Sequence, residues 1–407
     1  MTANNKPQHF TVLILVVMTT KNATLVTLPT ELIYRIIDHC NTKSLLFSIC
    51  LTCKRLYSIV NNYDRFEVDF YVNSTSNSNS FHKIIHPENV AIVNIKHDGT
   101  YLQRAALCQL SDYICQFPRL RSVKLQDINY KGIEYLFQGM TLDTLESLSI
   151  VIGSNDCSRR FSLISSAIMK YKLKKLYLTY PTNKIKGTIT WSDQNRLQHL
   201  EIPVCSYRDY ITILNYSTHL RTLRMQDCNF DGSDHATTVN LNLTCNSSLH
   251  SLTLTDCALY PRKIESMVSV IPSIIALKLV SEHKEQKDSI VDGQYWEKMI
   301  SSIIPSLEKF EFFFIISIRE SAKNSSLQSL ITPFKTQFWK KDKHWFVNCA
   351  FISSYQGIWL YTMPISEIRD TYWARWELST MDDVSRITKR SIHDRIDPTK
   401  GEVCLLI

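Results

Sequence analysis

The feature that most constrains the fold is an apolar spacing that recurs along more than half of the 407-residue chain. An apolar-x-x-apolar-x-apolar pattern returns at intervals that are mostly 23 to 30 residues. Its copies begin at Val90, Leu120, Leu145, Leu173, Leu197, Leu220, Leu249, Ile274 and Leu307. The alternation within each copy predicts a short strand with one buried face, and stretches between copies, such as residues 104–117 and 262–272, have helical apolar spacing. The pattern therefore predicts strand-then-helix units that share one core.

Three copies continue to a cysteine three residues after their last apolar position, at Cys205, Cys228 and Cys257. This L-x-x-L-x-L-x-x-C/N pattern resembles the leucine-rich-repeat signature. The copies that begin at Leu145 and Leu173 lack the Cys or Asn position, so the repeats are irregular. We therefore expect an α/β fold in which residues 90–333 form an irregular leucine-rich-repeat solenoid of parallel strands and helices.

Residues 25–65 carry a different pattern, that of three short amphipathic helices. Pro29 suits the first turn of a helix, and Glu31 places a negative charge near that helix's N-terminus. Asn41 and Thr42 break the apolar pattern and are suited to cap the next helix. Helices of this size cannot bury all their apolar surface among themselves, so we expect a partner to cover part of it.

This segment resembles an F-box. F-boxes open with Leu-Pro-x-Glu, here residues 28–31, and end near a Val-Cys-Lys-x-aromatic pattern, here residues 52–57 with Tyr57 as the aromatic. The resemblance implies docking to a Skp-type adaptor and, through it, to a cullin. The residues it nominates for adaptor contact are Leu28, Pro29, Leu32, Ile36, Leu45, Leu46, Ile49 and Tyr57. The alternative is an ordinary helical cap on the following domain.

The remaining segments complete the predicted organisation. We expect residues 1–24 to be disordered, the Asn/Ser-rich residues 66–89 to be a linker, and residues 380–407 to be a polar tail. Residues 334–379 are rich in aromatics and contain two strand patterns, which predicts a C-terminal cap on the repeats. Its aromatics could instead form a binding platform.

Catalytic and cofactor signatures are missing from the sequence. There is no glycine-rich phosphate loop, no H-E-x-x-H and no G-x-S-x-G, and Cys50 and Cys53 form a C-x-x-C without a second pair. The net charge of +8 is spread along the chain rather than clustered, which does not favour nucleic-acid binding. We therefore expect a binding protein rather than an enzyme, with no cofactor, no metal and no nucleic-acid partner.

Between the leucines of each strand, a row of polar residues should face solvent. We take this row as the candidate surface for an unknown protein substrate: Lys124, Tyr177, Glu201, Arg224, Thr253 and Lys278. The row is mixed and mildly basic, which would suit acidic or phosphorylated segments. The alternative is that any solvent-facing row of a sheet is polar.

These features predict a non-catalytic substrate-recognition adaptor of an SCF-type (Skp–cullin–F-box) ubiquitin ligase, in the cytoplasm or nucleus. One alternative is a secreted or membrane-displayed leucine-rich-repeat binding protein, with apolar residues 10–18 as signal core and N-x-[ST] sequons as glycosylation sites. Another is an F-box scaffold that acts outside any ligase. The ending Cys404-Leu-Leu-Ile fits a prenylation signal, and a membrane enters the prediction only if Cys404 is prenylated.

Overall fold

The computed structural model divides the chain into two compact units, Met1–Pro181 and Thr182–Ile407, which we describe separately. It describes residues 25–72, 85–97, 104–139, 143–151, 158–179, 189–191, 196–226, 248–255, 261–281, 292–317, 330–352 and 357–363. The expected disordered segment 1–24, with its apolar residues 10–18, and the tail 380–407 with Cys404 lie outside these residues.

Unit 1 begins with a group of short helices. They are η1 (Leu25–Thr27), α2 (Thr30–Ile37), α3 (Thr42–Ser44), η2 (Leu45–Ile49), α4 (Cys50–Thr52) and α5 (Lys54–Asn61). The segments α3, η2 and α4 follow one another without a break, and the middle one is a π-helix. Buried side chains from all three predicted helical stretches, among them Ile33, Leu45 and Leu56, form the core of this group.

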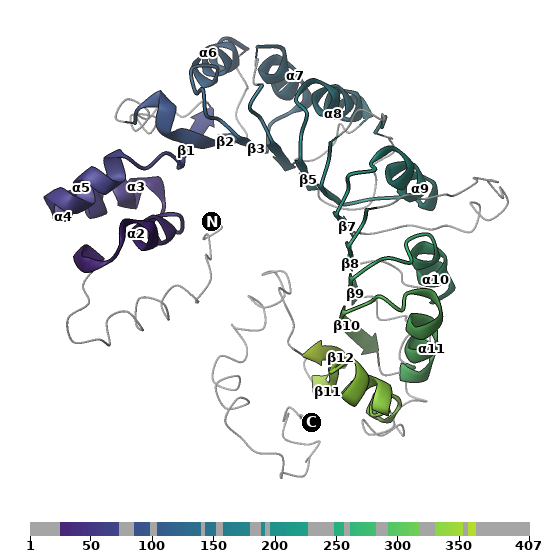
Figure 1. The fold of residues 1–407 in the computed structure, drawn as a ribbon. Coiled ribbons are helices and arrows are strands. Elements are labelled where there is room, and N and C mark those ends of the chain that lie inside the picture. The colour runs from purple at the N-terminus through teal and green to yellow at the C-terminus, as the bar shows by residue number, and fades with distance from the viewer. Residues whose placement is uncertain are drawn as a thin grey trace. The chain divides into compact units, whose positions relative to one another are not determined.

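The rest of unit 1 alternates strands with helices. Its strands are β1 (Phe66–Val72), β2 (Val90–His97), β3 (Ser122–Gln126), β4 (Ser147–Val151) and β5 (Lys175–Thr179), and each pairs in parallel with the next. Figure 1 shows α6 (Arg104–Ile114), α7 (Tyr130–Gly139) and α8 (Ser158–Lys170) together on one side of these strands. The pairing aligns the apolar positions of successive repeats in buried rows, one of which runs through Val93, Val123, Leu148 and Leu176.

Residues 66–72 differ from the expected linker over residues 66–89. They form β1, in which Phe66, Val68, Phe70 and Val72 are buried in alternation with more exposed residues. This strict period of two lets the strand pair with β2 and bury its apolar face. The linker interpretation was therefore wrong for these seven residues, and residues 73–84 lie outside the described part of the chain.

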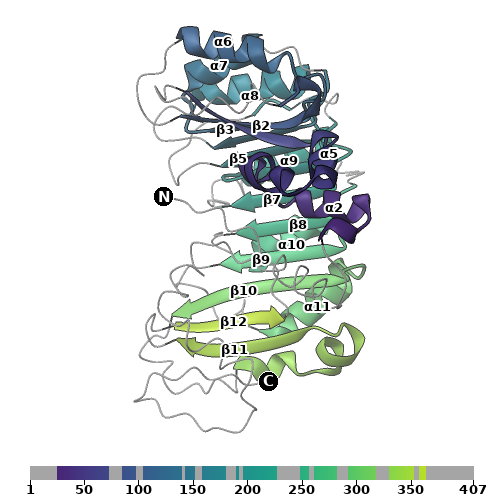
Figure 2. The same cartoon turned by 90° about the vertical axis from the view of Figure 1, so that its left-hand side faces the viewer.

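Unit 2 repeats the arrangement of strand and helix. Its parallel strands are β6 (His199–Ile202), β7 (Thr222–Gln226), β8 (Ser251–Thr255), β9 (Ala276–Ser281) and β10 (Lys309–Ser317), and Figure 2 shows β7 to β10 side by side. The helices α9 (Tyr207–Tyr216), α10 (Pro261–Ser269) and α11 (Gly293–Ile303) follow β6, β8 and β9 in the chain. A buried row runs through Leu200, Leu223, Leu252, Leu277 and Phe310.

The last described strands reverse direction. β12 (Gly357–Met363) pairs antiparallel with both β10 and β11 (Phe346–Ile352), so it lies between them although it follows both in the chain. These are the two strands that the sequence predicts within residues 334–379. Between β10 and β11 come η8 (Thr332–Phe334) and η9 (Phe338–Asp342).

An aromatic cluster packs beneath these last strands. Trp339 and Trp296 are fully buried and contact Phe310, while Phe312 stacks on Phe314 with ring centroids 4.9 Å apart. The Trp339 indole N–H donates a hydrogen bond to the carbonyl of Gly293 at 3.3 Å. These rings form core. Trp339 is the member that belongs to the aromatic-rich segment 334–379, in which Phe346 is exposed, so the cap stays a prediction.

Candidate functional site

The N-terminal helices expose an unusual share of large apolar side chains. Ten such side chains are exposed among the residues that the structure describes, and half of them fall within residues 25–67. They are Val26, Leu32, Phe47, Leu51 and Tyr57, with Leu51 the most exposed at 72%. They come from η1, α2, η2, α4 and α5, so every part of this helical group except α3 contributes. An apolar surface of this kind is typical of an interaction site.

Local hydrogen bonds hold the segments that carry these side chains. The Arg55 guanidinium on α5 donates to the carbonyls of Val26 and Leu28, at 2.8 Å for Leu28, and so fixes the Leu-Pro start of the domain. Asn41 caps α3 by accepting from the Ser44 N–H at 2.7 Å, as the sequence predicts. The Cys53 thiol caps α5 by accepting from the Leu56 N–H at 3.5 Å. Cys53 therefore has a structural role at this turn.

The structure separates the nominated contact residues into three groups. Pro29, Leu32 and Tyr57 are exposed, and Leu28, Leu46 and Ile49 are half-buried. Ile36 and Leu45 are buried in the core of the helical group, so in this conformation they support the surface rather than form it. Sequence reasoning missed Val26, Phe47 and Leu51, which are apolar residues outside the predicted stripes.

One comparison with known proteins bears on this surface. Residues 25–67 match the F-box domain. None of the curated proteins matches the chain. The F-box boundaries agree with the predicted segment 25–65 to within two residues at its C-terminal end. An F-box indicates, in general, a non-catalytic substrate adaptor of an SCF-type ubiquitin ligase, with a Skp-type protein as the usual partner of the domain.

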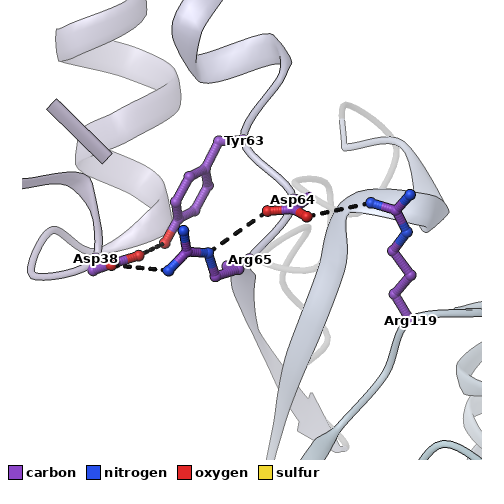
Figure 3. Close-up of polar contacts among 5 residues, drawn as sticks. All are labelled: Asp38, Tyr63, Asp64, Arg65 and Arg119. Carbon is purple, nitrogen blue, oxygen red and sulfur yellow. Dashed lines mark hydrogen bonds and ion pairs between the residues drawn. The ribbon is translucent and has the colours of Figure 1, made fainter. Parts of the chain in front are cut away.

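A polar network joins the F-box to the first strands and helices of unit 1, as Figure 3 shows. The Tyr63 hydroxyl donates to Asp38 at 2.8 Å, and Arg65 pairs with the same carboxylate at 3.1 Å. Arg65 also lies 3.6 Å from Asp64, which pairs at 3.3 Å with Arg119 in the turn between α6 and β3. The ionic side chains are each at least one-third exposed, so individual pairs contribute little; the network fixes geometry more than it adds stability.

Tyr63 is the buried member of this network. Its ring packs edge-on against Phe66, with centroids 5.2 Å apart. Burial, followed by the hydrogen bond to Asp38, raises the pKa of the Tyr63 phenol. The hydroxyl therefore stays protonated at neutral pH and remains a donor to the carboxylate that closes α2. The Thr42 hydroxyl also donates a hydrogen bond to the Glu67 carbonyl, which links α3 to β1.

The outward polar row is the second candidate surface, and the two units carry separate parts of it. In unit 1, Lys124, Ser149 and Tyr177 are neighbours on adjacent strands, and Lys124 pairs with Glu67 at 2.9 Å. In unit 2, the row comprises Glu201, Arg224, Thr253, Lys278 and Glu311, each beside the next. The structure therefore brings together the nominated residues within each unit.

A small cavity lies on the polar row of unit 2. Its volume is about 180 Å³, and its lining includes Arg224, Ser251, Thr253, Lys278, Lys309 and Glu311. Arg224 lies 3.9 Å from Glu201, and Glu311 lies 3.7 Å from Lys278 and 2.6 Å from Lys309. Sequence reasoning missed Lys309, because it is the first residue of its strand and lies outside the central outward position.

The described part of the chain carries neither a metal-binding cluster nor a membrane-spanning helix. No group of three or more His, Cys, Asp or Glu side chains there is arranged to hold a metal ion. None of the helices described combines the length and the apolar content that crossing a bilayer requires.

Proposed function

We propose that the chain is the substrate-recognition subunit of an SCF-type ubiquitin ligase. Its F-box docks a Skp-type adaptor and, through it, a cullin. Its later units bind a protein target, which is thereby held near the ubiquitin-carrying enzyme. The chain performs no covalent step; it supplies proximity and orientation. The observation that carries this proposal is the F-box match at residues 25–67, on a helical group that exposes five large apolar side chains.

The docking surface we propose is centred on Leu32, Leu51 and Tyr57. All three are well exposed, at 43%, 72% and 53%, and they come from three different helices. Phe47 lies one turn before Leu51 and adds to the same surface. Burial of such side chains by a partner stabilises the complex by about 25 cal/mol for each Å² of apolar area removed from water. This is the main driving force for association.

We also propose that residues 90–333 form leucine-rich repeats, with residues 334–379 as their C-terminal cap. Support comes from the apolar rows, in which the leucines of one repeat lie beside those of the next. Parallel strands separated by helices bury such rows continuously. The polar positions of the same strands then form the surface for the target.

Co-purification tests the proposed function. The full chain is co-expressed with a Skp-type adaptor, beside a variant that combines Leu32→Ala, Leu51→Ala and Tyr57→Ala. Met169→Ala is the matched control, because Met169 is 59% exposed on α8, outside the F-box. We expect the wild type and the control to retain the adaptor and the triple variant to lose it.

Failure of the wild-type chain to retain the adaptor would refute the proposed function. Addition of a cullin to the purified complex separates a ligase subunit from a scaffold. A ternary complex supports the ligase role, whereas an adaptor complex that excludes the cullin would contradict it.

A further inference from the structure

The cavity on the polar row of unit 2 has an unequal balance of charge. Arg224, Lys278 and Lys309 bring three positive charges to its lining, and Glu311 brings one negative charge. Glu201, which pairs with Arg224, is the second carboxylate of this group. The five ionic side chains therefore carry a net charge of +1.

Four of these five charges are partly withdrawn from water, whereas the Lys309 side chain is 60% exposed. The side chains of Lys278 and Glu311 are only 15% and 8% exposed, and those of Arg224 and Glu201 are 27% and 19% exposed. Charges in such surroundings interact more strongly than charges in bulk water, because the effective dielectric constant is lower. A negative group that entered the cavity would therefore meet a stronger attraction than at an ordinary surface lysine.

Arg224 also has an unused donor. Its Nε atom is buried and makes no hydrogen bond to any part of the chain that the structure describes. A buried donor without an acceptor is costly, and a ligand that supplies an oxygen removes this cost. The hydroxyls of Ser251 and Thr253 belong to the same lining and add two further donors.

We propose that this cavity binds the carboxylate of an Asp or Glu side chain in the target protein. Arg224 and Lys278 supply the charge, and Ser251 and Thr253 supply hydrogen bonds. A volume of about 180 Å³ holds one side chain of this size. The inference rests on the proposed function, in which this face of unit 2 receives the target.

A single carboxylate fits the cavity better than a phosphate does. One carboxylate matches the net charge of +1 that the five ionic side chains carry together. A phosphorylated residue carries up to two negative charges, which exceed this net charge, and Glu311 in the lining would repel it more strongly than it repels a single carboxylate. The cavity therefore favours an acidic segment that needs no phosphorylation.

Immobilised peptides test this inference with the purified full chain. The peptides share random flanks and differ at one central residue, which is Asp, Glu, Asn, Gln, Lys or phosphoserine. We expect Asp- and Glu-centred peptides to bind about tenfold more tightly than Asn- and Gln-centred ones, a difference of about 1.4 kcal/mol. Phosphoserine should bind no better than Asp.

Charge reversal at Lys278 provides the decisive variant. Lys278→Glu should abolish the acidic preference and create a preference for Lys-centred peptides, which simple loss of folding cannot produce. Lys298→Glu, on the exposed face of α11, makes the same charge change away from the cavity and should leave the preference unchanged.

Three outcomes would overturn the inference: equal binding of Asp- and Asn-centred peptides, tighter binding of phosphoserine, or an unchanged preference in Lys278→Glu. Adaptor co-purification is measured on the same samples. If the chain retains the adaptor but shows no acidic preference, carboxylate binding by the cavity is refuted and the proposed function stays intact. A chain that selects acidic peptides but does not retain the adaptor refutes the proposed function instead.

Discussion

Two leucines of the F-box, Leu51 and Leu56, lie close in sequence but differ in exposure, 72% against 1%. Both Leu→Ala substitutions remove the same atoms. At Leu56 the lost contacts lie inside the chain, so the cost should appear as lower stability. At Leu51 the lost contacts would be made only with the adaptor, so the cost should appear as weaker binding. The same substitution at these two positions therefore distinguishes a core residue from a docking residue.

The two magnitudes follow from the exposed fractions. Leu→Ala in a well-packed core costs about 2 to 5 kcal/mol of unfolding free energy, and Leu56 should fall in this range. Complete burial of a leucine is worth about 1.5 to 3 kcal/mol, and roughly three-quarters of Leu51 is available to be buried by a partner. Leu51→Ala should therefore cost about 1 to 2 kcal/mol of binding, a rise in Kd of roughly 5- to 30-fold.

Chemical unfolding and calorimetric titration with a Skp-type adaptor measure the two quantities on each variant. Leu51→Ala should unfold within about 0.5 kcal/mol of the wild type, as exposed substitutions usually do. The reasoning is refuted if Leu51→Ala binds the adaptor as tightly as the wild type does. It is also refuted if Leu51→Ala is as destabilised as Leu56→Ala, because Leu51 would then belong to the core.

Three further predictions concern stability. Tyr63→Phe removes a hydrogen bond to a carboxylate but keeps the ring, and should lower the unfolding free energy by about 1 kcal/mol in urea titration; no change would mean that the bond contributes nothing. Gly293→Ala places a Cβ 2.5 Å from the Pro333 carbonyl oxygen and should cost about 1 to 3 kcal/mol in the same assay, although Ala favours helices; a stabilised variant would contradict this packing. Burial raises the pKa of the Cys349 thiol from 9.0 to about 12, so the unfolded chain loses this proton at lower pH and the unfolding free energy should fall between pH 9 and 12. Cys349→Ala should show a shallower fall of the unfolding free energy with pH. An equal fall in both proteins would contradict the raised pKa of Cys349.

The strands of the repeats were predictable because their pattern is local. Alternation of apolar with polar residues has the same period as a strand, and the structure places β2 to β10 at the predicted copies. Strand β1 has an equally clear alternation at residues 66–72, yet the Asn/Ser-rich residues that follow it suggested a linker. Composition outweighed periodicity in that prediction, and periodicity was the better guide.

The docking surface was less predictable because the second F-box helix is not a regular α-helix. Residues 45–49 form a π-helix, and the Cys50 N–H donates to the carbonyl of Leu45, five residues earlier. Buried side chains therefore follow a spacing of five at this point, as Leu45 and Cys50 do. A regular helical period would bury Leu46 and Ile49 together with Leu45, whereas both are only half-buried. The exposure of side chains around a π-helix cannot be predicted from the regular helical period.

Hydrogen–deuterium exchange of the full chain, with and without a Skp-type adaptor, tests the central claim most directly. If the F-box is the docking domain, the adaptor should slow amide exchange in residues 30–37 and 45–61 and leave strands β7 to β10 of unit 2 unchanged. Exchange in residues 25–67 that is the same with and without adaptor, or protection confined to residues 222–226 and their neighbouring strands, would contradict it.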